Sequence, residues 1–376
     1  MQPVIGVGSK DSDWKHRVEP TFGDSRTWPH LDHEPHSDAD PSCGLASAGL
    51  LMREPSTPAE LTVCIPAFRS GEALSLAIQS ALQQRGAELL VVISVDGFDA
   101  ETLDICSRFA DDPRVRVTLQ AKRLGWAGNI SALLRGVRTP FFCVLPHDDL
   151  LGPEFVSRLL PALRARPDAT VAYCDIDFQS AGARFVRGVQ LPDAELAERA
   201  SAFFAAGGEA PPWRGITRSR VIPEHGFPTD AWDGFLVECE WAFHLLCAGP
   251  ALRISGAHFI KRLRADGSSA SSARLRRPAD ERRAAVADHE ARLDARLQHA
   301  FGAEAMPAAL RVHNRLNAMR RMMALGLGAP SSDALDALSM ALDETRHASP
   351  PLHARALCSL RLLQSFTASD PEAQHT

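Results

Sequence analysis

The sequence is short of lysine and of long apolar runs, and both shortages limit what the protein can be. Lysine occurs only at Lys10, Lys15, Lys122 and Lys261, so arginine carries almost all of the basic charge. The 41 basic and 46 acidic residues leave a formal net charge of −5, which does not predict a nucleic-acid partner. No apolar run approaches the roughly 18 residues of a membrane-spanning helix, and the first 30 residues lack a signal-peptide pattern. We therefore expect a cytoplasmic protein.

Several short motifs are also missing. The eight cysteines are scattered singly and include no CxxC pair, so we expect reduced thiols instead of a zinc or redox site. Neither GxGxxG nor GxxxxGK[ST] follows the first predicted strand. This absence disfavours a dinucleotide oxidoreductase and a P-loop enzyme.

The composition divides the chain into three parts. Residues 1–58 are rich in Pro, His, Asp, Ser and Gly without helical or strand periodicity, which predicts a disordered tail, and Met52 is an alternative start of translation. Over residues 59–272, short apolar runs alternate with amphipathic stretches, which predicts an α/β domain with a mostly parallel sheet flanked by helices. Residues 273–376 are rich in Ala, Leu and Arg, and we expect a helical extension with a disordered C-terminal end.

In the α/β part, strands and helices are expected to alternate, and ligands of such sheets bind at the carboxyl ends of the strands. The loops that matter are therefore residues 66–71, 96–99 and 146–149. We expect strands at 61–65, 89–95, 115–119, 141–145, 170–174 and 252–255, helices at 74–82, 101–110, 129–137, 153–166 and 237–247, and an irregular segment at 259–272.

Two pairs of aspartates follow predicted strands. Asp148 and Asp149 come directly after an apolar strand, where one or two carboxylates together with substrate phosphates commonly hold Mg²⁺ or Mn²⁺. For Asp175 and Asp177 we expect a solvated strand end instead.

Five sequence blocks, in order, carry a resemblance to a known family. They are VCIPAF (63–68), ISVDG (93–97), LGWAGN (124–129), LPHDD (145–149) and ECEW (238–241). With these blocks the chain resembles the family 2 glycosyltransferases of the GT-A fold over about residues 60–265. The resemblance implies inverting transfer of a sugar from a nucleotide-diphosphate donor, usually a UDP-sugar, to a hydroxyl of a sugar, lipid-linked or small-molecule acceptor.

The resemblance also implies roles for single residues on the donor side. Pro66, Ala67 and Phe68 would line the site of the nucleobase and ribose, and Asp96 would accept a hydrogen bond from the uracil imide. Arg123 and Asn129 would line the donor pocket.

Further matches concern the metal and the base. Asp148 and Asp149 match the metal and diphosphate motif, although Pro146 stands where many relatives have the first aspartate of that motif. Glu238 falls where the family places its catalytic carboxylate, with Glu240 as a register-shifted second choice.

Alternatives remain open at this point. Pro146 favours a non-catalytic GT-A-like nucleotide-binding or scaffold protein, whereas a carboxylate at Glu238 favours an enzyme. Nucleotidyl transfer is disfavoured because no glycine- and arginine-rich loop with a lysine follows the first strand. The helical extension could shape the acceptor site, form a homo-oligomer or contact the inner face of a membrane peripherally.

Overall fold

The computed structural model describes residues 58–229, 234–263, 276–302 and 305–367. They all belong to one unit, Met52–Thr376. The predicted disordered tail, except residue 58, and the predicted disordered C-terminal end lie outside the described residues.

Four parallel strands form the first half of the sheet, in the order β3-β2-β1-β4. They are β1 (Leu61–Ala67), β2 (Leu89–Val95), β3 (Val115–Leu119) and β4 (Phe141–Val144). Every residue of β1 and of β4 is buried, since helices cover both faces of the sheet and leave no place for an alternating polar pattern. The connecting helices are α1 (Ala73–Leu82), α2 (Ala100–Ser107) and α3 (Gly125–Gly136).

The second half of the sheet is mixed. From β4 it continues through β8, β6 and β9 to β5, and β7 pairs with the free part of β6. These strands are β5 (Leu150–Leu151), β6 (Val171–Gln179), β7 (Arg184–Arg187), β8 (Ile216–Arg218) and β9 (Ala251–Arg262). Short 3-10 turns at Pro211–Arg214 and Ser219–Val221 flank β8.

Two expectations about this half are wrong. Residues 259–262 are not irregular, because β9 runs in parallel with β6 as far as Arg262. Asp175 and Asp177 do not mark a solvated strand end: both lie within β6, where Asp175 pairs with Arg253 and Asp177, 1% exposed, pairs with Arg184. Arginines on neighbouring strands thus compensate both carboxylates.

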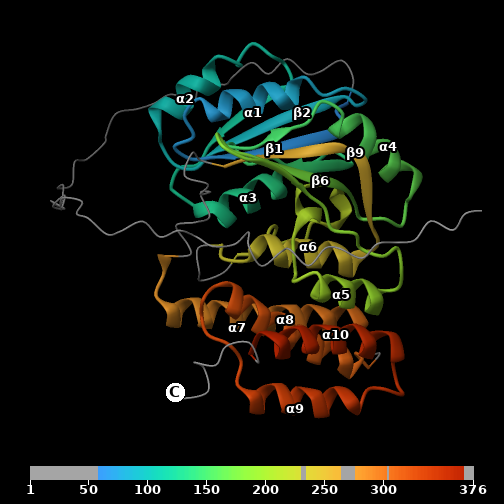
Figure 1. Cartoon of the computed structure of the whole chain (residues 1–376). Coiled ribbons are helices and arrows are strands. Elements are labelled where there is room, and N and C mark those ends of the chain that lie inside the picture. Colours follow the sequence, from blue (N-terminus) through green and yellow to red (C-terminus); the bar gives the residue numbers. More distant parts are fainter. Residues whose placement is uncertain (1–57, 230–233, 264–275, 303–304, 368–376) are drawn as a thin grey trace, which may run out of the picture. The chain divides into compact units, whose positions relative to one another are not determined.

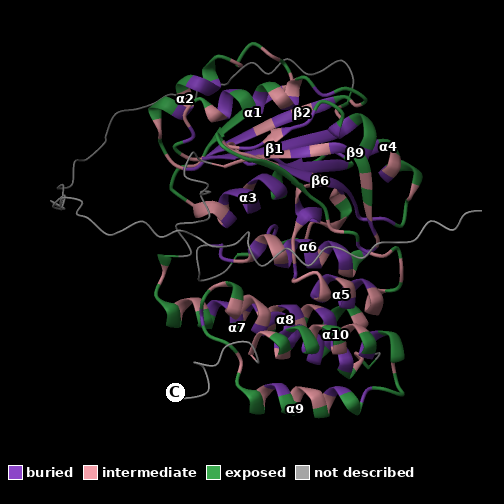
Figure 2. Cartoon of the chain, viewed as in Figure 1, coloured by how far each residue is buried: buried purple, intermediate pink, exposed green. Residues whose placement is uncertain are grey.

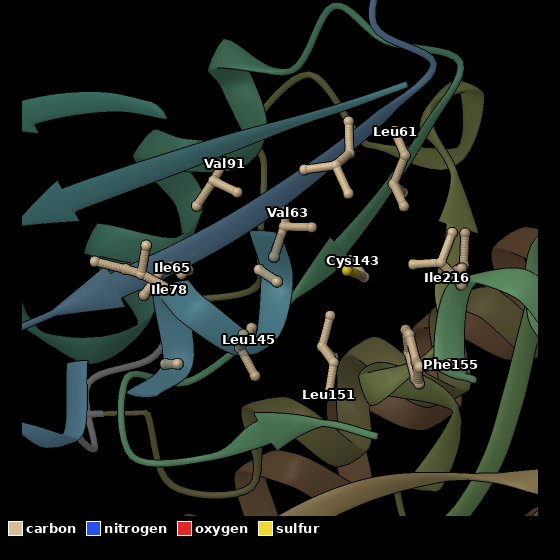
Figure 3. Close-up of a cluster of buried hydrophobic side chains, with 14 of the residues drawn as sticks. Leu61, Val63, Ile65, Ile78, Val91, Cys143, Leu145, Leu151, Phe155 and Ile216 are labelled. Carbon is tan, nitrogen blue, oxygen red and sulfur yellow. The ribbon is translucent and has the colours of Figure 1, made fainter. Parts of the chain in front are cut away.

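Separate cores lie on the two faces of the sheet. On one face α1, α2 and α4 (Phe155–Ala165) pack on the strands, and Figure 3 shows part of this core, including Val63, Ile65 and Ile78. On the other face lie α3 and α6 (Val237–Ala248), packed around Phe142 and Trp241 (Figure 1).

A stack of helices extends the second core away from the sheet (Figure 1). It comprises α5 (Leu196–Ala205), α7 (Ala279–Phe301), α8 (Ala308–Ala324), α9 (Ser332–Asp343) and α10 (Pro350–Thr367). Figure 2 shows that α9, the outermost helix, buries few residues, and only Leu335 and Leu342 of it are buried. Among the described helices, none combines the length and the apolar character that crossing a bilayer requires.

Candidate active site

The loops that follow β1, β2 and β4 meet at one edge of the sheet, because parallel strands present their carboxyl ends together. A ring nitrogen of His147, Nδ1, lies 3.1 Å from the carbonyl oxygen of Pro66 and ties the loop after β4 to the end of β1. The predicted metal motif and the predicted nucleobase loop are thus neighbours.

Asp149 is completely buried at this edge. Its Oδ1 accepts a hydrogen bond from the backbone N–H of Arg262 at 3.2 Å, whereas its Oδ2 has no hydrogen-bond partner. Arg214 Nε and Lys261 Nζ each lie 3.9 Å from Oδ2. Burial raises the pKa of Asp149, although the two cations act in the opposite direction.

Lys261 stands at the centre of a charged cluster. Burial, and then the neighbouring Arg214, lower its pKa, while the charges of Asp149, Asp148 and Glu238 raise it. The structure therefore brings together three acidic residues that the sequence singled out and two basic residues. The sequence does not identify Lys261 as a site residue, because it predicts an irregular segment there. The signal that could have identified it is a rare lysine directly after the strand-like run Phe259–Ile260.

The end of β9 fixes the position of the aspartate pair. Arg262 donates from Nε to the carbonyl oxygen of Asp148 at 2.8 Å and from its guanidinium to that of Ala73 at 3.2 Å. Together with the backbone bond to Asp149, these contacts hold the turn after β4 between β9 and α1. The side chain of Asp148 is half-buried, unlike that of Asp149.

The two candidate bases differ in their surroundings. Glu238, in the first turn of α6, is half-buried and acts on Lys261. Glu240 is 5% exposed and accepts a hydrogen bond from Arg292 Nε of α7 at 2.7 Å. Since that ion pair fastens α6 to α7, the geometry favours Glu238 as the base.

The side chains of Asp96 and Asn129 form hydrogen bonds within the fold. Both carboxylate oxygens of Asp96 accept backbone N–H bonds at the start of α3, from Leu124 at 2.6 Å and Gly125 at 2.9 Å. The amide of Asn129, 2% exposed, exchanges bonds of 2.6 and 2.9 Å with Ser94. Their direct contacts with the donor stay predictions, and these bonds count against them.

The remaining donor residues lie on the same edge. Pro66 and Ala67 form the buried end of β1, and Phe68 follows with its ring half-exposed. The guanidinium carbon of Arg123 lies 4.1 Å from the centroid of the Phe68 ring. This cation–π contact sets an arginine above the loop predicted to hold the nucleobase.

A divalent cation fits Asp148 better than Asp149. Mg²⁺ is commonly bound through one or two carboxylates with substrate phosphates and water, and the half-buried Asp148 suits that mode. Asp149 already faces two cations at 3.9 Å, which would repel a divalent ion. Within the described parts of the chain, no group of three or more His, Cys, Asp or Glu residues is arranged to hold a metal.

Comparison with known proteins agrees with this architecture. Residues 62–219 match the model of the family described as glycosyl transferase family 2. Over 138 residues the chain is 30% identical to the succinoglycan biosynthesis protein ExoO of Rhizobium meliloti (strain 1021), and this match spans only 37% of the chain and 38% of ExoO.

Solved structures extend the likeness. Those of S. aureus TarS 1-349, alone and in complex with UDP-GlcNAc, match with TM-scores of 0.54 and 0.57 at 14% identity, covering 83% of this chain and 92% of the TarS chain. The match covers 83% of the chain, which is a larger share than residues 59–272 make up. The shared fold therefore continues into the C-terminal helices. The predicted GT-A-like α/β fold is confirmed.

Proposed function

We propose that this chain is a transferase that uses a UDP-sugar and inverts the configuration at the anomeric carbon, since residues 62–219 match the model of glycosyl transferase family 2. The observation that carries the proposal is the charged cluster around Lys261, where Lys261 and Arg214 each lie 3.9 Å from Asp149 and the charges of Asp148 and Glu238 also act on the lysine. The complex of the TarS fragment with UDP-GlcNAc supports the choice of donor.

Departure of the diphosphate requires positive charge at the leaving oxygen. When the bond between the anomeric carbon and that oxygen breaks, negative charge develops on the β-phosphate. Lys261 and Arg214 are fixed by Asp149 before the donor arrives, so they stabilise this charge with little reorganisation. Asp148 would hold Mg²⁺ or Mn²⁺, which adds charge neutralisation when it is bound.

The acceptor must lose a proton as it attacks. Its hydroxyl oxygen forms the new bond to the anomeric carbon on the face opposite the leaving group, which inverts the configuration. Glu238 takes the hydroxyl proton, and general-base catalysis of this kind contributes roughly 10²–10⁴-fold. Glu238 is held in place because α6 packs through Trp241 against the sheet.

Donor binding can be tested without knowing the acceptor. We would measure the thermal stability of the full chain with UDP, GDP, ADP, CDP and dTDP, each with Mn²⁺ or with EDTA. A nucleotide at about 100 times its Kd stabilises the fold by roughly 2.7 kcal/mol, and we expect the largest melting shift with UDP and Mn²⁺. Equal or absent shifts with all five nucleotides would refute the donor assignment.

Glu238→Gln tests the base. The variant should keep the UDP-induced melting shift and lose roughly 10²–10⁴-fold in hydrolysis or transfer of the donor sugar. Glu154→Gln is the matched control, because Glu154 pairs with the exposed Arg158 on the surface. Full activity in the Glu238→Gln variant would exclude this base, and donor binding without turnover in the wild type would favour the non-catalytic alternative.

A further inference from the structure

A cavity lies between α6 and α7, with Pro223 among the residues that line it. Its volume is about 630 Å³, within the roughly 300–1,000 Å³ typical of small-molecule sites. The side chains that give it chemical character are Glu240 and His244 of α6, Arg292, Arg296 and His299 of α7, and His225. None of these is proposed to contact the donor, the metal or the acceptor in the transfer reaction.

The sequence of α7 explains both the space and the charge. Positions 292, 296 and 299 fall on one face of the helix because they are four and three residues apart. Ala295 and Ala300 beside them, and Ala248 across the gap, are too small to fill the space. Basic side chains of α7 therefore border an open cavity, although some of them also contact α6.

Arg292 is compensated by acidic neighbours. It donates from Nε to Glu240 at 2.7 Å and pairs with Asp288 one turn earlier on α7. Its charge is thus neutralised by these two carboxylates.

Arg296 has less compensation. It donates to Nδ1 of His244 at 2.6 Å, and the other nitrogen of that ring, Nε2, lies 2.7 Å from the carbonyl oxygen of Val221. A ring that donates from Nε2 and accepts at Nδ1 is neutral, and burial lowers the pKa of His244 to about 4. A neutral imidazole supplies no counter-charge.

The carboxylate that lies near Arg296 already pairs with another arginine. Glu240 Oε1 lies 4.0 Å from the Arg296 guanidinium, while Oε2 of the same group binds Arg292. The Nε of Arg296 is buried and has no hydrogen-bond partner among the described residues. Arg296, whose charge is compensated only in part by the shared carboxylate, borders a cavity large enough for a ligand.

We propose that this cavity binds a small phosphorylated molecule whose phosphate contacts Arg296. A guanidinium matches the geometry of a phosphate, which offers several charged acceptor oxygens at once. The exposed His225 and His299 provide further donors at the cavity, and the alanines leave room for an uncharged body. The inference does not depend on the proposed transferase mechanism.

Isothermal titration of the full chain with inorganic phosphate and with glucose 1-phosphate tests this proposal. We expect both to bind the wild type, with glucose 1-phosphate the tighter. Arg296→Gln should weaken both by about tenfold or more, as expected for loss of hydrogen bonds to a charged group. Arg315→Gln is the matched control, because Arg315 pairs with Glu290 elsewhere on α7, and it should leave binding unchanged.

Two further variants separate this site from the donor site and from misfolding. Lys261→Met removes a donor-site cation and should keep the phosphate binding that Arg296→Gln loses. Ala295→Phe fills the cavity from an exposed helix position, removes no charge and should also abolish binding. Binding lost in Lys261→Met but kept in Arg296→Gln and Ala295→Phe, or no binding to the wild type, would overturn the proposal.

Discussion

Replacing Asp149 by asparagine should destabilise the fold strongly, even with no metal or donor present. Asparagine keeps the size of the side chain and can still accept from the backbone N–H of Arg262. What it removes is the negative charge between Arg214 and Lys261, whose side chains are only 13% and 17% exposed. Two largely buried cations would then lose the buried carboxylate that they share, and only the less buried Asp148 and Glu238 would still act on Lys261.

The size of the effect follows from the distances. At 3.9 Å and an effective dielectric constant of about 20, each cation attracts Asp149 by about 4 kcal/mol before desolvation is subtracted. Removing one partner of a buried ion pair typically costs about 3–5 kcal/mol, because the remaining charge stays buried. We expect a loss in that range for Asp149→Asn, and partial recovery in the double variant Asp149→Asn/Lys261→Met, which removes one of the stranded cations.

Urea unfolding in EDTA distinguishes this role from that of a metal ligand. A carboxylate that served only to hold a metal would cost nothing when no metal is bound, so its asparagine variant would unfold at the urea concentration of the wild type. A change below about 1 kcal/mol in EDTA would refute the reasoning. It would mean that burial, which raises the pKa of Asp149, keeps the carboxyl protonated and leaves no ion pair to break.

Two further predictions concern stability. Burial lowers the pKa of His313 from 6.5 to about 3, so the contribution of its neutral ring to stability is fully present above pH 6.5 and is lost as the pH falls. Between pH 7.5 and pH 5 the His313→Gln variant should therefore lose about 2 kcal/mol less unfolding free energy than the wild type. Urea unfolding at both pH values measures this difference. A methyl group on Gly215 would overlap the carbonyl oxygen of Ala172 in β6, so Gly215→Ala should cost about 1–3 kcal/mol in the same assay. Gly136→Ala, at the last residue of α3, is its control, because the added methyl meets nothing within 4 Å and should not destabilise the fold. Equal effects of the two changes would contradict the steric argument.

Much of the fold could be predicted from local patterns. The strands β1, β2 and β4 are mostly apolar runs, and this signal is clear because β1 and β4 are buried on both faces. The end of β9 could not be predicted in the same way. Lys261 and Arg262 are charged, and they belong to a strand only because β6 and Asp149 supply hydrogen bonds and counter-charge from elsewhere in the chain.

The same limit applies to the aspartates of the site. An aspartate at a strand end can bind a ligand, cap a helix or compensate a buried cation, and its neighbours in sequence do not decide among these roles. Asp96 caps α3 and Asp149 compensates Lys261 and Arg214, whereas Asp148 keeps a half-buried carboxylate at the site. The partners come from α3, from β9 and from the turn before β8, all distant along the chain.

The choice between Glu238 and Glu240 shows what the helical extension adds to the site. Residues two apart on a helix differ by about 200° around its axis, so the two carboxylates of α6 cannot both face the donor edge of the sheet. Arg292 of α7 binds Glu240, whereas the charge of Glu238 acts on Lys261. The Arg292–Glu240 pair therefore helps to hold α6 in this orientation, and a variant that weakens it should act on turnover through Glu238.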